Sequence, residues 1–156
     1  MSEDASFEDG AEVPLNLVAM DDEDLQILSS LVQDAVFPIT EMRWHARNKQ
    51  LALLVNRFRW EDSARERHGA ERVRALLVID NVMGIASQGI DRGAHDMILQ
   101  VLSVSFDPGQ DIDGHVTLTL AGDGAIRARV EALEVRLRDV TRPYKAPSGR
   151  APDHQI

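Results

Sequence analysis

The chain has 156 residues, no cysteine and a formal net charge of −9 at pH 7. That length fits one domain whose core is large enough to fold without covalent cross-links. The lack of cysteine excludes disulfide frameworks, thiolate zinc sites and cysteine nucleophiles. No apolar run approaches the ~20 residues of a membrane span, and the N-terminal residues do not resemble a secretory signal. We therefore expect a cytoplasmic protein that does not enter a membrane.

The charged residues are unevenly distributed along the chain. Residues 1–41 contain eleven acidic residues and no Lys or Arg, whereas residues 43–74 contain nine of the seventeen basic residues and four acidic ones. Such asymmetry can mark an interaction surface. The alternative is that the acidic segment keeps the chain soluble while the arginines cover exposed strand faces.

Three segments divide the chain. Residues 1–12 are polar and acidic, which predicts a disordered tail. A single domain is expected over residues 13–142. Residues 143–156 are rich in proline and have no apolar period, so we expect a flexible C-terminal tail.

The N-terminal part of the domain predicts a short strand, Leu15–Met20, followed by a helix. Asp21 is suited to cap that helix, and the three acidic residues after it favour the positive end of the helix dipole. The helix should end before Pro38 and pack its apolar face on a sheet. Its apolar positions recur at helical spacing: Leu25, Leu28, Val32 and Ala35.

From Phe37 onward the hydrophobic period is close to two, which indicates strands. A charged loop is expected over residues 61–70, and a short helix near Ala94–Leu99. The Gly122-Asp123-Gly124 turn predicts a hairpin between a strand over His115–Ala121 and a strand that starts at Ala125. The predicted strands are Phe37–His45, Gln50–Trp60, Arg72–Ser87, Leu102–Phe106 and His115–Ala121.

The segment Ala125–Val140 has two interpretations. Its aliphatic residues match helical spacing, but they also alternate, with a phase slip at Glu131-Ala132 that is typical of a strand with a β-bulge. An internal comparison favours the strand, because Ile79–Ile85 aligns with Val130–Arg136.

The same alignment suggests two pseudo-repeated halves, residues 13–90 and 91–142. Each half would contain a helix or helical turn and then three strands, the third long and bent. The predicted fold class is therefore α+β: a mostly antiparallel β-sheet with one N-terminal α-helix packed on it. The pattern leaves open whether the two halves share one sheet.

Sequence motifs of established chemistry were not found. The chain has no phosphate loop, dinucleotide-binding glycine pattern, zinc-protease motif or serine-hydrolase motif. Asp107, Asp111 and Asp113 alternate like calcium ligands, but the terminal bidentate acid of a calcium loop has no counterpart. We therefore predict no catalytic residue, no metal and no cofactor.

The most distinctive stretch is Asn56–Glu61. Alternation within it predicts Arg57 and Arg59 on one strand face, with the aromatic residues Phe58 and Trp60 on the other. Arginines beside aromatic residues can bind anions or single-stranded nucleic acid. The alternative is an amphipathic strand whose arginines are solvated or ion-paired.

We predict that Arg57 and Arg59, together with Asp91 and Arg92, form a recognition surface. Exposed arginines contribute little to folding, so their concentration in one segment favours binding. Double-stranded DNA is not an expected partner, because the net charge of −9 repels phosphate and no predicted helix has a basic face.

Several motifs, taken in order, resemble a family of small alphaproteobacterial proteins with a domain of unknown function. The resemblance covers roughly residues 15–142. It implies a bacterial cytoplasmic protein and supplies no activity, cofactor or catalytic residue. The motifs are Leu17–Ala35, Asn56-Arg57-Phe58-x-Trp60-Glu61, Gly89-Ile90-Asp91-Arg92, Phe106-x-Pro108-Gly109 and Gly124-Ala125-Ile126-Arg127.

The function predicted from the sequence is a non-enzymatic binding or regulatory module that recognises another protein, with a homo-oligomer as one form of that interaction. One alternative is a binder of an anion, a nucleotide or RNA through the arginine-rich residues 43–74. The other is a small enzyme with an acid/base pair such as Asp91 and Arg92.

Overall fold

The computed structural model describes residues 14–61, 71–91, 93–141 and 144–145, which are mostly antiparallel strands with one α-helix. The predicted α+β class is confirmed. The elements, in chain order, are β1 (Asn16–Ala19), α2 (Asp22–Leu31), β2 (Val36–Pro38), the 3-10 helix η2 (Ile39–Glu41), β3 (Met42–His45), β4 (Gln50–Phe58), β5 (Glu71–Ile79), β6 (Val82–Gln88), β7 (Ile98–Pro108), β8 (Gly114–Leu120), β9 (Gly124–Val130), β10 (Val135–Asp139) and β11 (Tyr144–Lys145).

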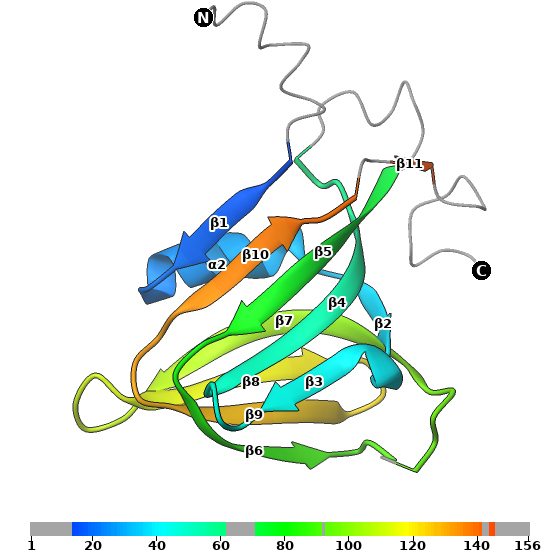
Figure 1. Cartoon of the computed structure of the whole chain (residues 1–156). Helices are drawn as coiled ribbons and strands as arrows, with labels where there is room; N and C mark the ends of the chain where they lie inside the picture. The colour runs from blue at the N-terminus through cyan, green and yellow to red at the C-terminus, as the bar shows by residue number, and fades with distance from the viewer. Residues whose placement is uncertain (1–13, 62–70, 92, 142–143, 146–156) are drawn as a thin grey trace, which may run out of the picture.

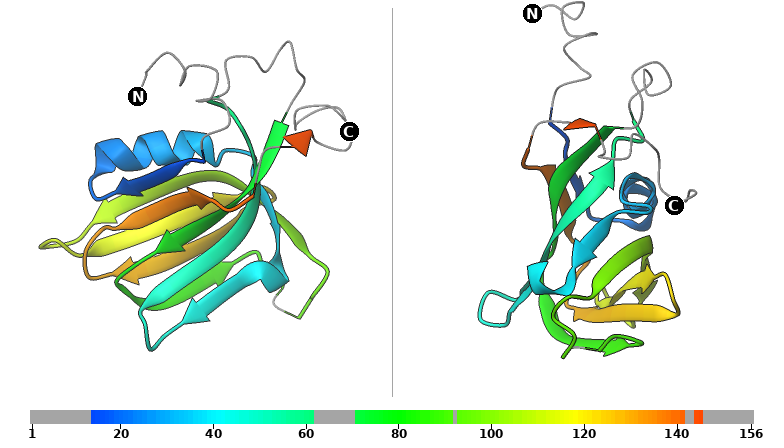
Figure 2. Two further views of the ribbon diagram at one scale, coloured as in Figure 1. Left: turned by 45° about the horizontal axis from the view of Figure 1, so that its top comes forward. Right: turned by 90° about the vertical axis from the view of Figure 1, so that its right-hand side faces the viewer.

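The strands form two curved layers, which we name sheet one and sheet two. Sheet one has the order β1-β10-β5-β4, with β3 and β2 both pairing with the outer edge of β4 and β11 pairing with β5. Sheet two has the order β7-β8-β9-β6. The short strand β2 joins the layers, because it pairs with β4 and with β7. Helix α2 and sheet two lie on the same side of sheet one (Figures 1 and 2).

Two long bent strands cross from one layer to the other. The first continues from β5 into β6, and it bends at Asn81, whose φ is 61°. The second continues from β9 into β10. They pair with each other in both layers, β5 with β10 and β6 with β9. At the crossing, the Asp80 N–H donates to the Glu134 carbonyl and the Glu131 N–H donates to the Asn81 carbonyl, each at 2.9 Å.

This crossing answers two questions that the sequence left open. Ala125–Val140 is strand rather than helix, since β9 and β10 occupy it with a break between Val130 and Val135. The two halves share one hydrogen-bonded path of strands. The order β10-β5-β4-β3 in sheet one corresponds to β6-β9-β8-β7 in sheet two, while an origin of these halves by duplication stays a prediction.

The N-terminal helix begins where the sequence predicts and ends earlier. Asp21 is its N-cap: the carboxylate accepts a hydrogen bond of 2.8 Å from the Asp24 N–H. Leu25 and Leu28 are the buried residues of this helix. The helix ends before Pro38 as predicted, but the expected continuation through Ala35 is wrong, because the chain turns at Asp34, whose φ is 65° and whose N–H donates to the Val101 carbonyl.

Several other elements also differ from the prediction. The strand expected over Phe37–His45 is divided by η2 into β2 and β3. The short helix expected near Ala94–Leu99 is absent from the described residues there; turns closed by the Asp91 and Ala94 carbonyls precede β7 instead. The tail predicted over residues 143–156 contains the short paired strand β11, and its remainder lies outside the described residues, as do residues 1–12 and most of the loop at 61–70.

The core fills the space between the two sheets and beneath α2. It consists of the alternate, inward-facing side chains of the strands, such as Leu51, Leu53 and Val55 of β4. The outward-facing positions of β8 and β9 are mostly polar. None of the described helices is long and apolar enough to cross a membrane.

Candidate functional site

The two arginines predicted to form an exposed recognition surface are buried. Arg57 has 0% of its surface exposed and Arg59 has 5%. The prediction that they lie on an open face is therefore wrong. A role of these residues in binding stays a prediction. The argument for that role assumed that both arginines are exposed, and they are not.

Every N–H donor of the Arg57 guanidinium has an acceptor. Its Nε and Nη2 atoms donate to the Asp139 carboxylate, at 3.0 Å each. Its Nη1 and Nη2 atoms donate to the Glu61 carboxylate, at 2.9 and 2.8 Å, and Nη1 also donates to the Phe58 carbonyl. The Asp139 carboxylate accepts a further hydrogen bond from the Leu15 N–H. Arg57 therefore makes a bidentate interaction with each of two carboxylates, which indicates a structural role for this residue.

The register of β4 explains why Arg57 points inward. Leu51, Leu53 and Val55 face the core, and Arg57 is the next residue of the same alternation. Asp139 continues the inward face of β10 in the same way. Alternation counted from Leu51, rather than within residues 56–60 alone, could have predicted that Arg57 is buried and needs buried carboxylate partners.

The neighbouring residues complete this buried cluster. Arg59 donates to Glu71 at 2.6 Å, and the Trp60 indole donates to the Gln33 carbonyl at 2.9 Å. The Arg72 guanidinium lies 3.9 Å from the centre of the Phe58 ring, which buries the ring on the opposite strand face. We name Arg57, Glu61 and Asp139 the buried arginine cluster, since these three make its densest contacts.

The electrostatics of the cluster favour its charged form. Burial by itself would lower the pKa of Arg57, but the hydrogen bonds from the guanidinium to Glu61 and Asp139 raise it overall. Burial by itself would raise the pKa of Glu61, but the hydrogen bond and the charge of Arg57 lower it overall. Arg57 and Glu61 therefore each favour their charged form in the folded chain.

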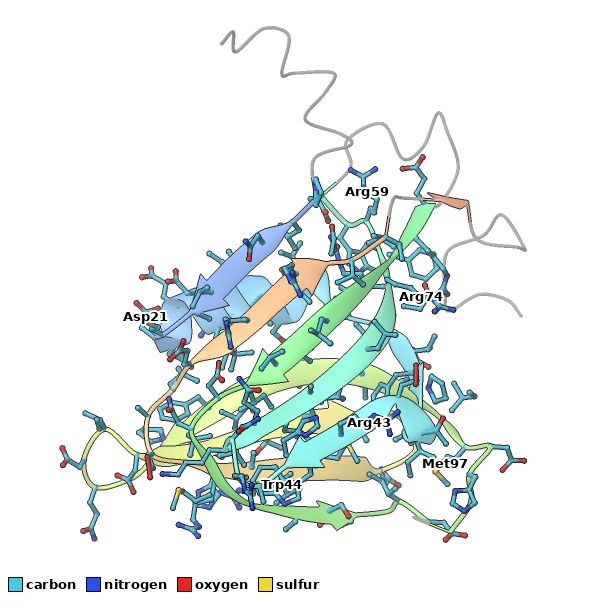
Figure 3. The ribbon with its side chains drawn as sticks, viewed as in Figure 1. Asp21, Arg43, Trp44, Arg59, Arg74 and Met97 are labelled. Atoms are coloured by element: carbon cyan, nitrogen blue, oxygen red, sulfur yellow. The ribbon has the colours of Figure 1, made fainter. Side chains whose placement is uncertain are left out.

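The hydrogen bonds and ion pairs of Arg57 within the described residues do not include Asp91. Asp91 is exposed and its carboxylate accepts from the Gly93 N–H at 3.0 Å, while Arg92 lies outside the described residues. Figure 3 shows Arg43 on β3, well separated from Arg59 and Arg74 at the far ends of β4 and β5. Arg43 therefore does not form one basic patch with Arg59 and Arg74.

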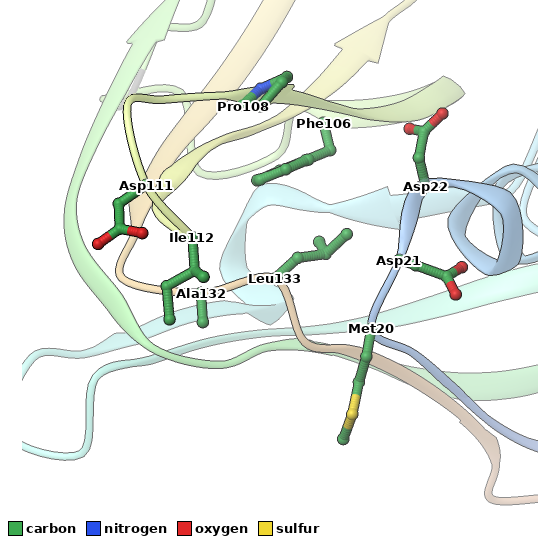
Figure 4. A pocket seen from close by; sticks show the side chains of 9 residues that line it. All are labelled: Met20, Asp21, Asp22, Phe106, Pro108, Asp111, Ile112, Ala132 and Leu133. Carbon is green, nitrogen blue, oxygen red and sulfur yellow. The ribbon is translucent and has the colours of Figure 1, made fainter.

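A different surface contains a groove of about 610 Å³. It lies between the start of α2, the end of β7, the β7–β8 loop and the β9–β10 connection (Figure 4). Its lining combines apolar side chains with carboxylates and includes no Lys or Arg: Met20, Asp21, Asp22, Phe106, Pro108, Asp111, Ile112, Ala132 and Leu133. We name it the acidic-rimmed groove.

Two apolar side chains stand exposed on this groove. Ile112 has 71% of its surface exposed and Met20 has 63%, the largest values among the large apolar residues of the described chain. Phe106 and Leu133 are more buried and line the same groove. Isolated exposed apolar residues are ordinary on a protein surface, whereas these two line the same hollow.

Local chemistry fixes the loop that carries Ile112. The Gly109 N–H donates to the Asp113 carbonyl at 2.8 Å, and the Asp111 N–H donates to the Asp113 carboxylate at 3.0 Å. A Cβ atom at Gly114 would lie 2.7 Å from the Phe106 ring, so glycine there lets the ring pack against the strand. The loop is closed by its own carboxylate, and Ile112 in this loop is largely exposed.

The comparisons with known proteins agree with the family suggested by the sequence motifs. Residues 15–154 match the family described as "Protein of unknown function (DUF2948)". The chain belongs to that family. No curated protein and no solved structure matches the chain. Membership brings no activity with it, so the function of the chain has to be argued from its own residues.

Sequence reasoning missed the groove, although signals for it were present. Met20 stands directly before the helix cap, where it cannot reach the helix's buried face, and Ile112 is an aliphatic residue between two aspartates. The spacing of Asp107, Asp111 and Asp113 resembles that of calcium ligands, which says nothing about an apolar groove beside them. No group of three or more His, Cys, Asp or Glu side chains within the described residues is arranged to hold a metal ion.

Proposed function

We propose that this chain is a binding module that recognises another protein through the acidic-rimmed groove. The observation that carries the proposal is that Ile112 and Met20, the most exposed of the large apolar side chains, line one groove. Burying an apolar side chain of this size contributes about 1.5–3 kcal/mol. A partner that covers both residues would therefore gain substantial binding free energy.

The charges on the rim indicate the chemistry of the partner segment. Asp21, Asp22 and Asp111 line the groove, and no basic residue lines it. The exposed Glu23 and Asp24 follow in the first turn of α2. The complementary ligand is a segment with a large apolar side chain flanked by Lys or Arg. Charge complementarity of this kind sets orientation and association rate, while the apolar contact supplies affinity.

The two other functions considered from the sequence receive less support. A nucleotide or RNA site in residues 43–74 would need Arg57 and Arg59 to be accessible, and both are buried. An acid/base pair formed by Asp91 and Arg92 would need a cleft around them, whereas the Asp91 carboxylate closes a turn on Gly93. A cytoplasmic location and a homo-oligomeric form stay predictions from the sequence.

A quantitative pull-down with matched variants tests the proposal. The tagged full chain is compared with a Met20→Asp, Ile112→Asp double variant and with Ile98→Asp, a control at an apolar residue that is 61% exposed but does not line the groove. We expect a protein partner that is retained by the parent and the control and lost by the double variant. Overlapping peptides from that partner should bind through a segment with a basic and apolar composition.

The result that would contradict the proposal is equally specific. A partner captured equally well by the groove double variant would place recognition elsewhere on the chain. A bound segment that is acidic, or that still binds after its Lys and Arg residues are replaced by Glu, would contradict the role given to the rim. Circular dichroism of the variants verifies that each is folded before the comparison is made.

A further inference from the structure

The outer face of sheet two, which points away from the core, has two arginines on β9. Arg127 and Arg129 alternate with the buried residues Ala128 and Val130, so both arginine side chains leave the sheet on the same face. Two residues along a strand span about 7 Å, and arginine side chains are long enough to reach one anion from that spacing. His115 of β8 pairs with Arg129 in register and therefore lies beside it on this face.

Small residues of β6 leave a hollow beside the two arginines. Gly84 pairs with Arg129, and Ala86 pairs with Arg127. Since neither residue has a side chain beyond Cβ, β6 leaves room next to both guanidinium groups; a Cβ atom at Gly84 would lie 3.8 Å from Arg129 Nη2. The hollow measures about 410 Å³ and is lined by Gly84, Ile85, Ala86, His115, Arg127 and Arg129.

The chain itself supplies little negative charge to this hollow. The Arg127 guanidinium lies 3.6 Å from the Asp107 carboxylate, and the two side chains are 51% and 66% exposed, so solvent screens the pair. Arg129 has no ion pair with any residue that the structure describes. None of the residues that line the hollow is acidic. Positive charge is therefore concentrated here in a chain whose net charge is −9.

The donors around the hollow match a phosphate monoester better than a single carboxylate. A phosphate monoester has a charge of about −1.5 to −2 at neutral pH and three terminal oxygens that accept hydrogen bonds. A guanidinium donates two parallel hydrogen bonds to such oxygens, so two arginines and an imidazole together can serve all three. One carboxylate has two oxygens and a single charge, which one arginine satisfies.

We propose that this hollow binds a phosphate monoester group, held by Arg127 and Arg129 with His115 as a further donor. We name these three residues the basic hollow. A phosphorylated side chain of a partner protein and a small phosphorylated molecule offer the same chemistry to it. The site shares no lining residue with the acidic-rimmed groove and does not depend on it.

The phosphate group itself, rather than a nucleic acid, is the ligand that this surface favours. The residues that line the hollow include no Phe, Tyr or Trp on which a base could stack. A long polyanion would also meet the net charge of −9, whereas a compact phosphate group meets chiefly the two arginines.

Titration of the isotope-labelled full chain with inorganic phosphate tests the proposal by nuclear magnetic resonance. The ionic strength is held constant, and the signals followed are the Nε–H groups of Arg127 and Arg129, the His115 ring and the amides of Gly84 and Ala86. We expect these signals to shift together and to saturate with a dissociation constant of about a millimolar or lower. Sodium chloride at the same ionic strength should not reproduce the shifts.

Ligands of matched size distinguish the two sources of phosphate. A blocked peptide with phosphoserine between two alanines is compared with glycerol phosphate and with peptides that have serine or glutamate at the same position. The phosphoserine peptide should bind about tenfold more tightly than the glutamate peptide, and the serine peptide should not bind. Tighter binding of the phosphoserine peptide than of glycerol phosphate indicates a partner protein as the source, and the reverse order indicates a small molecule.

Variants separate the basic hollow from a general effect of charge. Arg127→Gln with Arg129→Gln should weaken phosphate binding by about tenfold or more, while Arg138→Gln, at an exposed arginine of β10, should leave it nearly unchanged. His115→Gln should weaken binding by about two- to tenfold, as expected for the loss of one hydrogen bond.

Gly84→Val provides a second route if the double arginine variant does not fold. It keeps every charge of the chain and fills the space beside Arg129 with a side chain suited to a strand. Phosphate binding should be weakened as strongly as by the loss of the arginines, and the amide spectrum verifies that the variant is folded.

Four results would overturn the proposal. The first is the absence of shifts at Arg127 and Arg129 up to about 10 mM phosphate, and the second is the same set of shifts with sodium chloride. The third is undiminished binding by folded Gly84→Val, which would place the anion outside the hollow. The fourth is a response to single-stranded oligouridylate without any response to phosphate monoesters. Met20→Asp with Ile112→Asp should leave phosphate binding intact, so failure here and failure of the groove are distinguishable.

Discussion

Arg57 on β4 and Arg129 on β9 are both strand arginines in an acidic chain, and their surroundings are opposite. Arg57 is fully buried and held by the carboxylates of Glu61 and Asp139. Arg129 is exposed on the outer face of sheet two and has no ion pair with a described residue. Both follow the alternation of their strands, in which Arg57 shares a face with Val55 and Arg129 lies between the buried residues Ala128 and Val130.

The contrast shows that the density of arginines along a sequence says little about where charge is available for binding. The segment 43–74 has the most arginines, yet two of its arginines neutralise carboxylates inside the fold. Exposed arginines also lie on β9, in a part of the chain whose overall charge is negative. Whether an arginine faces inward or outward along its strand decides whether it is buried in the fold or exposed to solvent.

The largest expected effect comes from breaking the buried arginine cluster. Arg57→Ala would leave the carboxylates of Asp139 and Glu61 without their partner, and removing one member of a buried pair costs about 3–5 kcal/mol. Urea denaturation should show a correspondingly lower free energy of unfolding. Arg129→Ala is the matched exposed control and should change it by less than about 0.5 kcal/mol. Equal midpoints for the two variants would mean that Arg57 is not the structural residue described here.

The second prediction concerns pH. The pKa of Glu61 is lowered in the folded chain from its ordinary value of 4.5, so folding favours its ionised form. The stabilisation by Glu61 is therefore complete above its unfolded pKa and is lost as the pH falls through its lower, folded pKa. The difference in unfolding free energy between the parent and Glu61→Gln should be largest near neutral pH and should shrink in acid.

A matched exposed carboxylate controls for general acid effects in that measurement. Glu131 pairs with Lys49 at 3.1 Å, and both side chains are about half exposed. Glu131→Gln should show little difference from the parent at any pH, because exposed ion pairs contribute about 0–1 kcal/mol. A Glu61→Gln difference that stays constant from neutral to acidic pH would contradict the ionised pair with Arg57.

The third prediction is at the cap of α2. Asp21→Ala removes the hydrogen bond to the Asp24 N–H and should lower the stability by about 1 kcal/mol. Asp21→Asn keeps an acceptor oxygen and should recover most of that loss. Thermal melts compare the three proteins, and coincident melts for Asp21→Ala and the parent would show that the cap contributes nothing to stability.

Those elements of the fold that depend on local signals could be predicted from the sequence. Asp21 has capping chemistry that acts within one turn, and Gly122 and Asp123 adopt positive φ in the β8–β9 hairpin, as expected for such a turn. The helix end could not be predicted, because it depends on the hydrogen bond from Asp34 to Val101 across the fold. The break of Phe37–His45 into two strands likewise follows from pairing with different neighbours, β7 and β4.

The candidate sites were harder to predict for a related reason. The groove brings Met20 and Ile112 together from positions about ninety residues apart in the sequence. The partner of Arg57, Asp139, lies 82 residues away. Contacts between distant segments decide both features.

The smallest expected effect belongs to the exposed pair of Arg127 and Asp107. Their closest atoms are 3.6 Å apart and both side chains are more than half exposed, so water and salt screen their attraction. A double-mutant cycle with Arg127→Ala and Asp107→Ala should give a coupling energy below about 0.5 kcal/mol that decreases further at high salt. A coupling above about 1 kcal/mol would mean that Arg127 is engaged by its own chain in the way that Arg57 is. The contrast between the two arginine environments would then reduce to Arg129 alone.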